Sequence, residues 1–157
     1  MNKYMQIAKE LADDNLETNV GGPFGACIVK DGKIIGKGSN HVLKNNDPTA
    51  HAEIEAIRDA CKNINSHDLK GCEIYTTCYP CPMCLSAIIW SNIKTVYYGN
   101  TKEDAEFIGF RDKHIYTNID KINSENSIDI LSMLPLDREE TIKTFNEFVA
   151  KKDKTIY

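Results

Sequence analysis

Strand-like and helix-like segments alternate along this chain, and that order limits the folds open to it. Runs of β-forming residues at 24–29 and 33–38 flank Asp31-Gly32, a dipeptide typical of hairpin turns. Two further strand patterns, at 72–77 and 93–98, each follow a helical pattern. Strands separated by helices of this length predict an α/β domain, in which helices cover both faces of one central sheet.

The predicted helices are recognised by their apolar spacing and by the residues at their ends. A first helix covers about residues 4–16, and Gly21-Gly22-Pro23 interrupts its pattern. After a polar loop at 39–48, a second helix begins near Thr49, a residue favoured as N-cap. A third helix, at 83–90, is apolar on nearly all sides. We therefore expect this third helix to be deeply buried.

The last third of the chain has weaker patterns. Residues 103–120 predict one or two short helices, and 127–131 a last strand, which would bring the sheet to about five strands. Asp137 with Glu140 is typical of a helix start, and this last helix would continue to about residue 149. A chain of 157 residues fits one domain over residues 1–157.

The six cysteines suggest either disulfides or a metal site. Charged residues from Lys9 onward precede any long apolar stretch, so we find no secretory signal and expect a cytoplasmic protein, where disulfides are rare. The uncharged stretch at 74–93 contains Pro80, Pro82 and several hydroxyl side chains, so we reject it as a membrane span. In a reducing compartment, closely spaced cysteines more often bind metal or take part in catalysis.

Two short motifs, each at the start of a predicted helix, are typical of a catalytic zinc site. They are His51-Ala52-Glu53 and Pro80-Cys81-Pro82-Met83-Cys84. His51, Cys81 and Cys84 suit one zinc ion per chain, and three protein ligands leave the fourth position open for water. Glu53 would take the proton of that water and deliver it to the leaving group. His-x-Glu followed by Pro-Cys-x-x-Cys is the signature of zinc deaminases.

The choice of cysteines stays open on spacing alone. Cys78-Tyr79-Pro80-Cys81 is itself a Cys-x-x-Cys, and Cys78 as a fourth ligand would close a purely structural site. We prefer Cys81 and Cys84 because Cys78 lies at the end of a predicted strand, before the turn. The remaining cysteines, Cys27, Cys61 and Cys72, are predicted to be core residues.

Beyond the zinc motif, the chain resembles the purine deaminases of the cytidine deaminase-like superfamily, and among them the bacterial guanine deaminases. The resemblance covers most of the chain. It rests on Gly21-Gly22-Pro23-Phe24-Gly25-Ala26, Asn46-Asp47-Pro48-Thr49-Ala50-His51-Ala52-Glu53, Pro80-Cys81-Pro82-Met83-Cys84, Gly109-Phe110 with Asp112, Ile115-Tyr116 and the final Tyr157.

The resemblance implies a three-layer α/β/α cytidine deaminase-like fold with a mixed sheet, and a homodimer that exchanges the segment at about 137–157. It implies hydrolysis of guanine to xanthine and ammonia. In this hypothesis hydroxide on the zinc attacks the amino-bearing carbon, and Glu53 shuttles the proton.

The resemblance also implies roles for individual residues around a purine base. Phe24 would stack on the base opposite His51, Asn40 and Asp112 would bind its polar groups, and Tyr157 would close the partner's site. Trp90 and Phe110 would shape the pocket wall. The substrate-binding residues implied in this way are Phe24, Asn40, Ala52, Trp90, Phe110, Asp112 and Tyr157.

Charge weighs against a nucleic-acid substrate. The chain has 19 Lys and Arg against 23 Asp and Glu, a net charge of −4, whereas an enzyme that acts on tRNA needs a basic face. Guanosine deaminase, cytosine deaminase and tRNA adenosine deaminase are the alternatives within the enzymes. A zinc-binding interaction module is the alternative outside them, and such a module would be marked by loss of the acid, whereas Glu53 is present.

Overall fold

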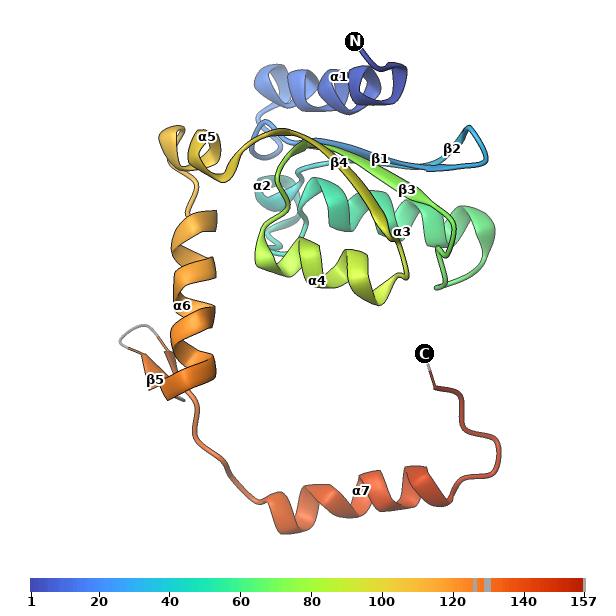
Figure 1. The fold of residues 1–157 in the computed structure, drawn as a ribbon, viewed down its shortest axis with the longest axis vertical. Helices are drawn as coiled ribbons and strands as arrows, with labels where there is room; N and C mark the ends of the chain where they lie inside the picture. The colour runs from blue at the N-terminus through green and yellow to red at the C-terminus, as the bar shows by residue number, and fades with distance from the viewer. Residues whose placement is uncertain (126, 129–130, 157) are drawn as a thin grey trace. The chain divides into compact units, whose positions relative to one another are not determined.

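The computed structural model describes residues 1–125, 127–128 and 131–156, and its contacts divide the chain into two compact units, Met1–Thr117 and Asn118–Tyr157. The first unit contains both zinc motifs. Its elements in chain order are α1 (Lys3–Thr18), β1 (Gly25–Lys30), β2 (Lys33–Ser39), α2 (Val42–Asn45), α3 (Ala52–Ile64), β3 (Glu73–Cys78), α4 (Pro82–Trp90), β4 (Thr95–Asn100), α5 (Lys102–Phe107) and the start of α6 (Asp112–Glu125) (Figure 1).

The sheet of the first unit has the strand order β2-β1-β3-β4. Strand β1 is antiparallel to β2 and β3, whereas β3 and β4 are parallel, so the sheet is mixed. Figure 1 shows α1 on one face of the sheet and α3 and α4 on the other. The predicted α/β/α layers are therefore confirmed.

The prediction of about five strands is wrong by one for the described part of the chain. The residues expected to form the fifth strand make two short strands, β5 (Ser127–Ile128) and β6 (Leu131–Ser132), which pair with each other in a separate ladder. A β-forming run of a few residues does not specify its partner, because pairing depends on contacts far apart in the sequence.

Alternate residues of β1 enter two different hydrophobic clusters. Ala26 and Ile28 pack with the alanines of α3 in the larger cluster, whereas Cys27 and Val29 pack with Tyr75 and residues of α1. Successive side chains of a strand point to opposite faces, so β1 is covered on both sides. This burial explains why its sequence is a continuous apolar run and not an alternating one.

Helix α3, which carries the first zinc motif, lies unusually close to β2. A Cβ at Gly36 would overlap the backbone carbonyl oxygen of Ala56, and a Cβ at Gly38 would overlap that of Ala52. Ala52, Ala56 and Ala60 are fully buried on the facing side of the helix. Small residues on both elements therefore fix how far the start of α3 lies from the sheet.

Two local predictions differ from the structure. The polar loop at 39–48 contains a single helical turn, α2, which ends at Asn46 in the left-handed conformation. The second predicted helix, α3, begins at Ala52 with His51 as its N-cap, whereas the sequence predicted a start near Thr49. Thr49 instead donates its backbone N–H and hydroxyl to Asp47, in a local turn that competes with helix formation.

Helix α4 is only partly buried, contrary to the prediction. Cys84 and Ile88 face the protein interior, but Ile89 and Trp90 are 66% and 68% exposed. The sequence pattern is apolar all round, whereas the sheet covers only one side of this helix.

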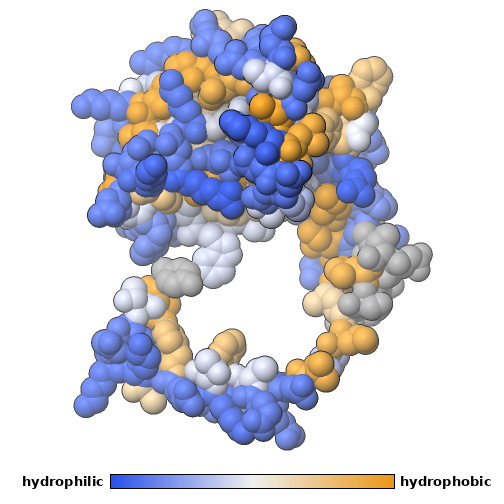
Figure 2. Space-filling model, turned by 180° about the vertical axis from the view of Figure 1, so that it is seen from behind, coloured by the Kyte–Doolittle hydropathy of each residue, from blue (hydrophilic) through white to orange (hydrophobic). Residues whose placement is uncertain are grey.

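The second unit contains the end of α6, the β5–β6 pair and α7 (Arg138–Ala150). Asp137 precedes α7 as predicted, but it adopts a left-handed conformation and its side chain makes no capping hydrogen bond. No residue of α7 is buried, and Figure 2 shows hydrophobic side chains exposed along the segment that leads into it. Within the described residues, no helix is long and apolar enough to cross a membrane.

Candidate active site

Three side chains that can bind a metal ion meet where α3 and α4 begin. His51 is the N-cap of α3 and Cys81 the N-cap of α4, and Cys84 lies in the first turn of α4. Each cysteine sulfur lies 3.6 Å from Nδ1 of His51, and the three atoms lie within 4.8 Å of one another. Tetrahedral zinc with ordinary bond lengths separates sulfur and nitrogen ligands by about 3.5 Å. The donor set and its spacing therefore fit zinc.

The backbone brings these ligands together by ending two helices at one place. Neither N-cap side chain makes a capping hydrogen bond, so both are free to face the metal position. Pro82 occupies the first position of α4, where the absent N–H costs no helical hydrogen bond. The two helix N-termini place positive partial charge beside the thiolates and favour their ionised form.

The two cysteines shift each other's pKa in opposite directions. A hydrogen bond from the Cys84 thiol, together with one from His51, lowers the pKa of Cys81 to about 4. The same bond raises the pKa of Cys84 above its ordinary value. The hydrogen bond to Cys81 also raises the pKa of His51. Because zinc binds the thiolate form, metal binding has to release the remaining proton.

Glu53 is a buried carboxyl group beside the metal position. It lies in the first turn of α3, two residues after His51, and only 6% of it is exposed. Burial is the main cause that raises its pKa above the ordinary value of a glutamate. A carboxyl group with a raised pKa, facing a pocket, is suited to accept and return a proton.

A pocket opens beside two of the three ligands, His51 and Cys81, and beside Glu53. Phe24 and Phe110 form one wall with their rings edge to face, at a centroid separation of 4.8 Å. The residues lining the pocket are Phe24, Asn40, His51, Glu53, Cys78, Tyr79, Cys81, Phe110 and Asp112.

The structure brings most of the predicted substrate residues to this pocket. Phe24, Asn40, Phe110 and Asp112 line it, and burial raises the pKa of the Asp112 carboxyl group. Ala52, between His51 and Glu53 in the sequence, does not line the pocket; it is fully buried and packs in the main core cluster.

Of the two remaining predicted substrate residues, only Trp90 can be compared with the pocket. Trp90 is the last residue of α4, is largely exposed and is not part of the lining. Tyr157 lies outside the described residues. Their roles remain predictions.

Cys78 lines the pocket but does not join the metal ligands. Within the described chain, the cluster able to hold a metal is His51, Cys81 and Cys84. Cys78 is the last residue of β3, and its thiol donates to the carbonyl oxygen of Thr101 at 3.5 Å. Burial raises its pKa to about 12, so it stays a neutral thiol. The alternative of a closed four-ligand site with Cys78 therefore has no support in the geometry.

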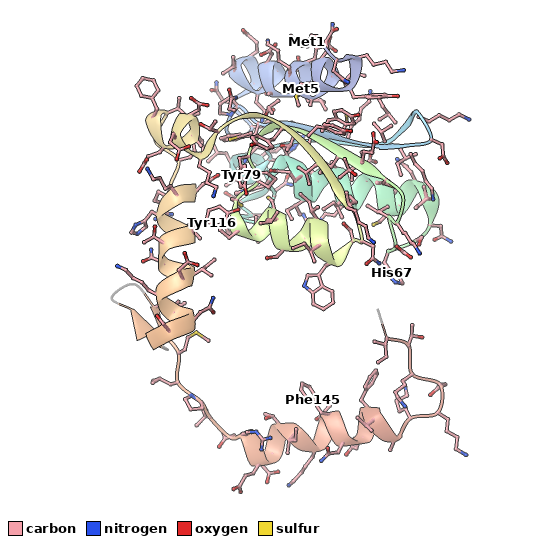
Figure 3. The ribbon with its side chains drawn as sticks, in the orientation of Figure 1. Met1, Met5, His67, Tyr79, Tyr116 and Phe145 are labelled. Carbon is pink, nitrogen blue, oxygen red and sulfur yellow. The ribbon has the colours of Figure 1, made fainter. Side chains whose placement is uncertain are left out.

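Two tyrosines support the loop before Cys81, and the sequence patterns did not single out either of them for this role. The hydroxyl of Tyr116 donates to the carbonyl oxygen of Pro80 at 2.8 Å. The rings of Tyr79 and Tyr116 lie close to each other (Figure 3). The ammonium of Lys102 lies over both rings, 4.5 and 4.1 Å from their centroids. These contacts help to fix the loop that carries Cys81.

An α/β/α domain that holds one histidine and two cysteines at two helix starts, beside a buried glutamate, has the site of a zinc-dependent deaminase. Residues 1–100 match the family described as the cytidine and deoxycytidylate deaminase zinc-binding region. The chain belongs to this family.

Individual relatives differ in how much of the chain they match. Guanine deaminase of Bacillus subtilis is 43% identical over 150 residues, 96% of each chain, and its crystal structure covers 100% of this chain and 99% of its own with a TM-score of 0.91. A guanine deaminase structure from Nitrosomonas europaea is 34% identical, covers 68% of this chain and 62% of its own, and has a TM-score of 0.65. The tRNA-specific adenosine deaminase of Aquifex aeolicus is 50% identical, over 48% of this chain and 50% of its own.

Proposed function

We propose that this protein hydrolyses guanine to xanthine and ammonia. The observation that carries the proposal is the extent of the match to the Bacillus subtilis guanine deaminase, which continues through the segment beyond residue 100. The tRNA-specific relative in Aquifex matches only about half of the chain. The net charge of −4 also weighs against a polyanionic substrate.

In this proposal His51, Cys81 and Cys84 hold the metal and Glu53 moves the proton. Zinc with an open coordination position lowers the pKa of a bound water toward about 7. The carboxylate of Glu53 accepts a proton from the attacking water and passes it to a ring nitrogen of guanine. A second proton, returned through Glu53, leaves with the amino group as ammonia. Water supplies the oxygen that replaces this amino group on carbon-2.

The remaining pocket residues would orient the base. Phe24 would stack on the base opposite His51, and the ring of Phe110, edge to face with that of Phe24, supports this wall of the pocket. Asn40 and Asp112 offer a hydrogen-bond donor and a carboxylate for the polar edges of the base. Ala52 would contribute through its backbone, because its side chain is buried.

Ammonia release from a panel of substrates tests the proposal. We expect kcat/KM for guanine to exceed that for adenine, cytosine, cytidine and a tRNA anticodon stem by at least about 100-fold, because mismatched polar groups would be left unpaired in the pocket. Comparison of kcat/KM for guanine and for guanosine shows whether the enzyme acts on the free base or on the nucleoside. A higher rate with cytosine or tRNA would overturn the substrate while leaving the metal chemistry intact. Absence of both zinc and ammonia release would favour a non-catalytic binding module.

We also propose that the protein works as a cytoplasmic homodimer in which the segment 137–157 of one chain completes the site of the other, with Tyr157 as the closing residue. Two apolar surfaces support a partner of the same chain: Ile89 and Trp90 on α4, and Phe145 and Val149 on α7, are all more than half exposed. All six cysteines are free thiols, which suits a reducing compartment.

Mixing two inactive variants tests the exchange. Glu53→Gln leaves the closing residue intact, and Tyr157→Ala leaves the proton shuttle intact. If the tail closes the partner's site, mixed dimers regain one working site, and a 1:1 mixture should recover about a quarter of wild-type activity. Mixtures with the double variant E53Q/Y157A serve as control. Activity no higher than the sum of the separate variants, or a monomer by light scattering, contradicts the exchange.

A further inference from the structure

Helix α1 contains one buried polar side chain that the metal chemistry does not use. Asn15 is 4% exposed, although α1 otherwise packs on the sheet through small apolar residues such as Ala8 and Ala12. Its Nδ2 donates to the carbonyl oxygens of Gly22 and Asn40, both at 2.8 Å. One amide thus ties together the segment before β1 and the segment after β2, and both segments border the pocket.

The side chain of Asn40 is held in one orientation by the same network. Its Oδ1 accepts hydrogen bonds from the backbone N–H groups of Gly22 and Val42, each at 3.2 Å. Its own backbone N–H donates to the carbonyl oxygen of Phe24 at 3.0 Å. No acceptor among the described residues is hydrogen-bonded to Nδ2 of Asn40, and this residue lines the pocket. Asn40 therefore offers a donor to whatever occupies the pocket.

Reversal of the Asn40 amide is prevented by the backbone donors around it. A reversed amide would set Nδ2 against the N–H groups of Gly22 and Val42, donor against donor. Asn15 anchors both residues of the Gly22–Asn40 contact, because its Nδ2 donates to the carbonyl oxygen of Gly22, next to the peptide whose N–H faces Oδ1, and to the carbonyl oxygen of Asn40 itself. The space is also tight, because a Cβ at Gly21 would overlap Oδ1 of Asn40.

We propose that Asn15 is a positioning residue for substrate binding, which acts through Asn40 by fixing the direction of its amide. The pocket then presents a donor at this wall and selects a base with an acceptor atom there. This inference rests on the proposed function, because it names how the same pocket recognises its purine. Asn15 touches neither the base nor the metal.

A double-mutant cycle on the zinc-loaded protein tests this role. Asn15→Leu removes both donors at nearly constant shape, and Asn40→Ala removes the amide that they orient. We expect N15L to raise KM for guanine about tenfold while kcat changes less than about threefold, because uniform binding is lost and the proton shuttle is intact. In the N40A background, N15L should change KM less than about twofold, since its effect passes through Asn40.

Leu11→Ala is the matched control for packing. Leu11 lies on the same helix, near Gly25, and its side chain cannot hydrogen-bond to the loop. L11A should lower the melting temperature without raising KM. If N15L does not fold, Asn15→Ser, which keeps one donor, should show a smaller rise in KM and the same dependence on Asn40.

The proposal is overturned if N15L leaves KM unchanged, if its effect on KM multiplies with that of N40A, or if L11A raises KM equally. These failures are distinct from failure of the proposed function, in which the wild-type protein would not deaminate guanine at all.

Discussion

Replacement of Glu53 by glutamine is expected to abolish turnover while the protein keeps one zinc per chain. Glutamine has the shape of glutamate but cannot accept a proton from water, and no other carboxyl group lies in the same first turn facing the pocket. Glu53 is not one of the three clustered ligands, so the metal should stay bound. We expect kcat to fall by roughly 10³-fold or more, the upper range for loss of a general acid–base group. Ammonia release and elemental analysis of the same sample measure both effects.

Glu55→Gln is the control for this experiment. Glu55 also lies in the first turn of α3, but it pairs with Arg58 at 2.7 Å and is not part of the pocket lining. An E55Q variant should keep its activity within about threefold, because a surface ion pair contributes little. If E53Q keeps more than about 1% of wild-type kcat, the assignment of Glu53 as proton shuttle is wrong.

The metal centre could be predicted from sequence because its chemistry needs particular side chains at particular spacings. His51, Cys81 and Cys84 were identified in this way, and the structure brings them together. Spacing did not decide between Cys78 and Cys84, since each forms a Cys-x-x-Cys with Cys81. The decision came from geometry: Cys78 ends β3 and bonds to the backbone of Thr101, away from the cluster.

The support of the pocket could not be predicted, because it depends on contacts between distant segments. Asn15 appears in the sequence as a polar residue on an amphipathic helix, where exposure to solvent is the ordinary expectation. Its partner Asn40 is 25 residues away. The same holds for Tyr116, whose bond to Pro80 spans 36 residues. The one sequence signal for the role of Asn15 was its position, as a polar residue on the side of α1 that faces the sheet.

Predictions from local pattern failed where packing decides the outcome. The apolar pattern of α4 suggested complete burial, yet one side of the helix, with Ile89 and Trp90, is exposed. The run at 127–131 suggested a fifth strand of the sheet, yet β5 pairs with β6. Hydrophobic patterns show that a surface needs a partner, but they do not show which one. On α4 the partner we propose is a second copy of the chain.

Loss of a zinc ligand should remove both the metal and the stability that it provides. We expect Cys84→Ser to lower zinc content well below one per chain and to reduce kcat about as strongly as E53Q, because serine is a poor zinc ligand at neutral pH. Removal of zinc from the wild-type protein by a chelator should lower the free energy of unfolding by at least about 3 kcal/mol, since a ligand bound only by the folded state stabilises it. Thermal unfolding with and without chelator measures this loss.

Cys78→Ser separates this effect from general loss of a buried thiol. A serine hydroxyl can donate to the carbonyl oxygen of Thr101 as the Cys78 thiol does, so C78S should keep its zinc and most of its activity. Proton release supplies a second readout, because zinc binds thiolates and the hydrogen bond to Cys81 raises the pKa of Cys84 above its ordinary value. Return of zinc to the apoprotein should therefore release at least about one proton per ion at pH 7, and C84S should lose this release. Equal zinc loss in C78S and C84S would instead place Cys78 among the ligands.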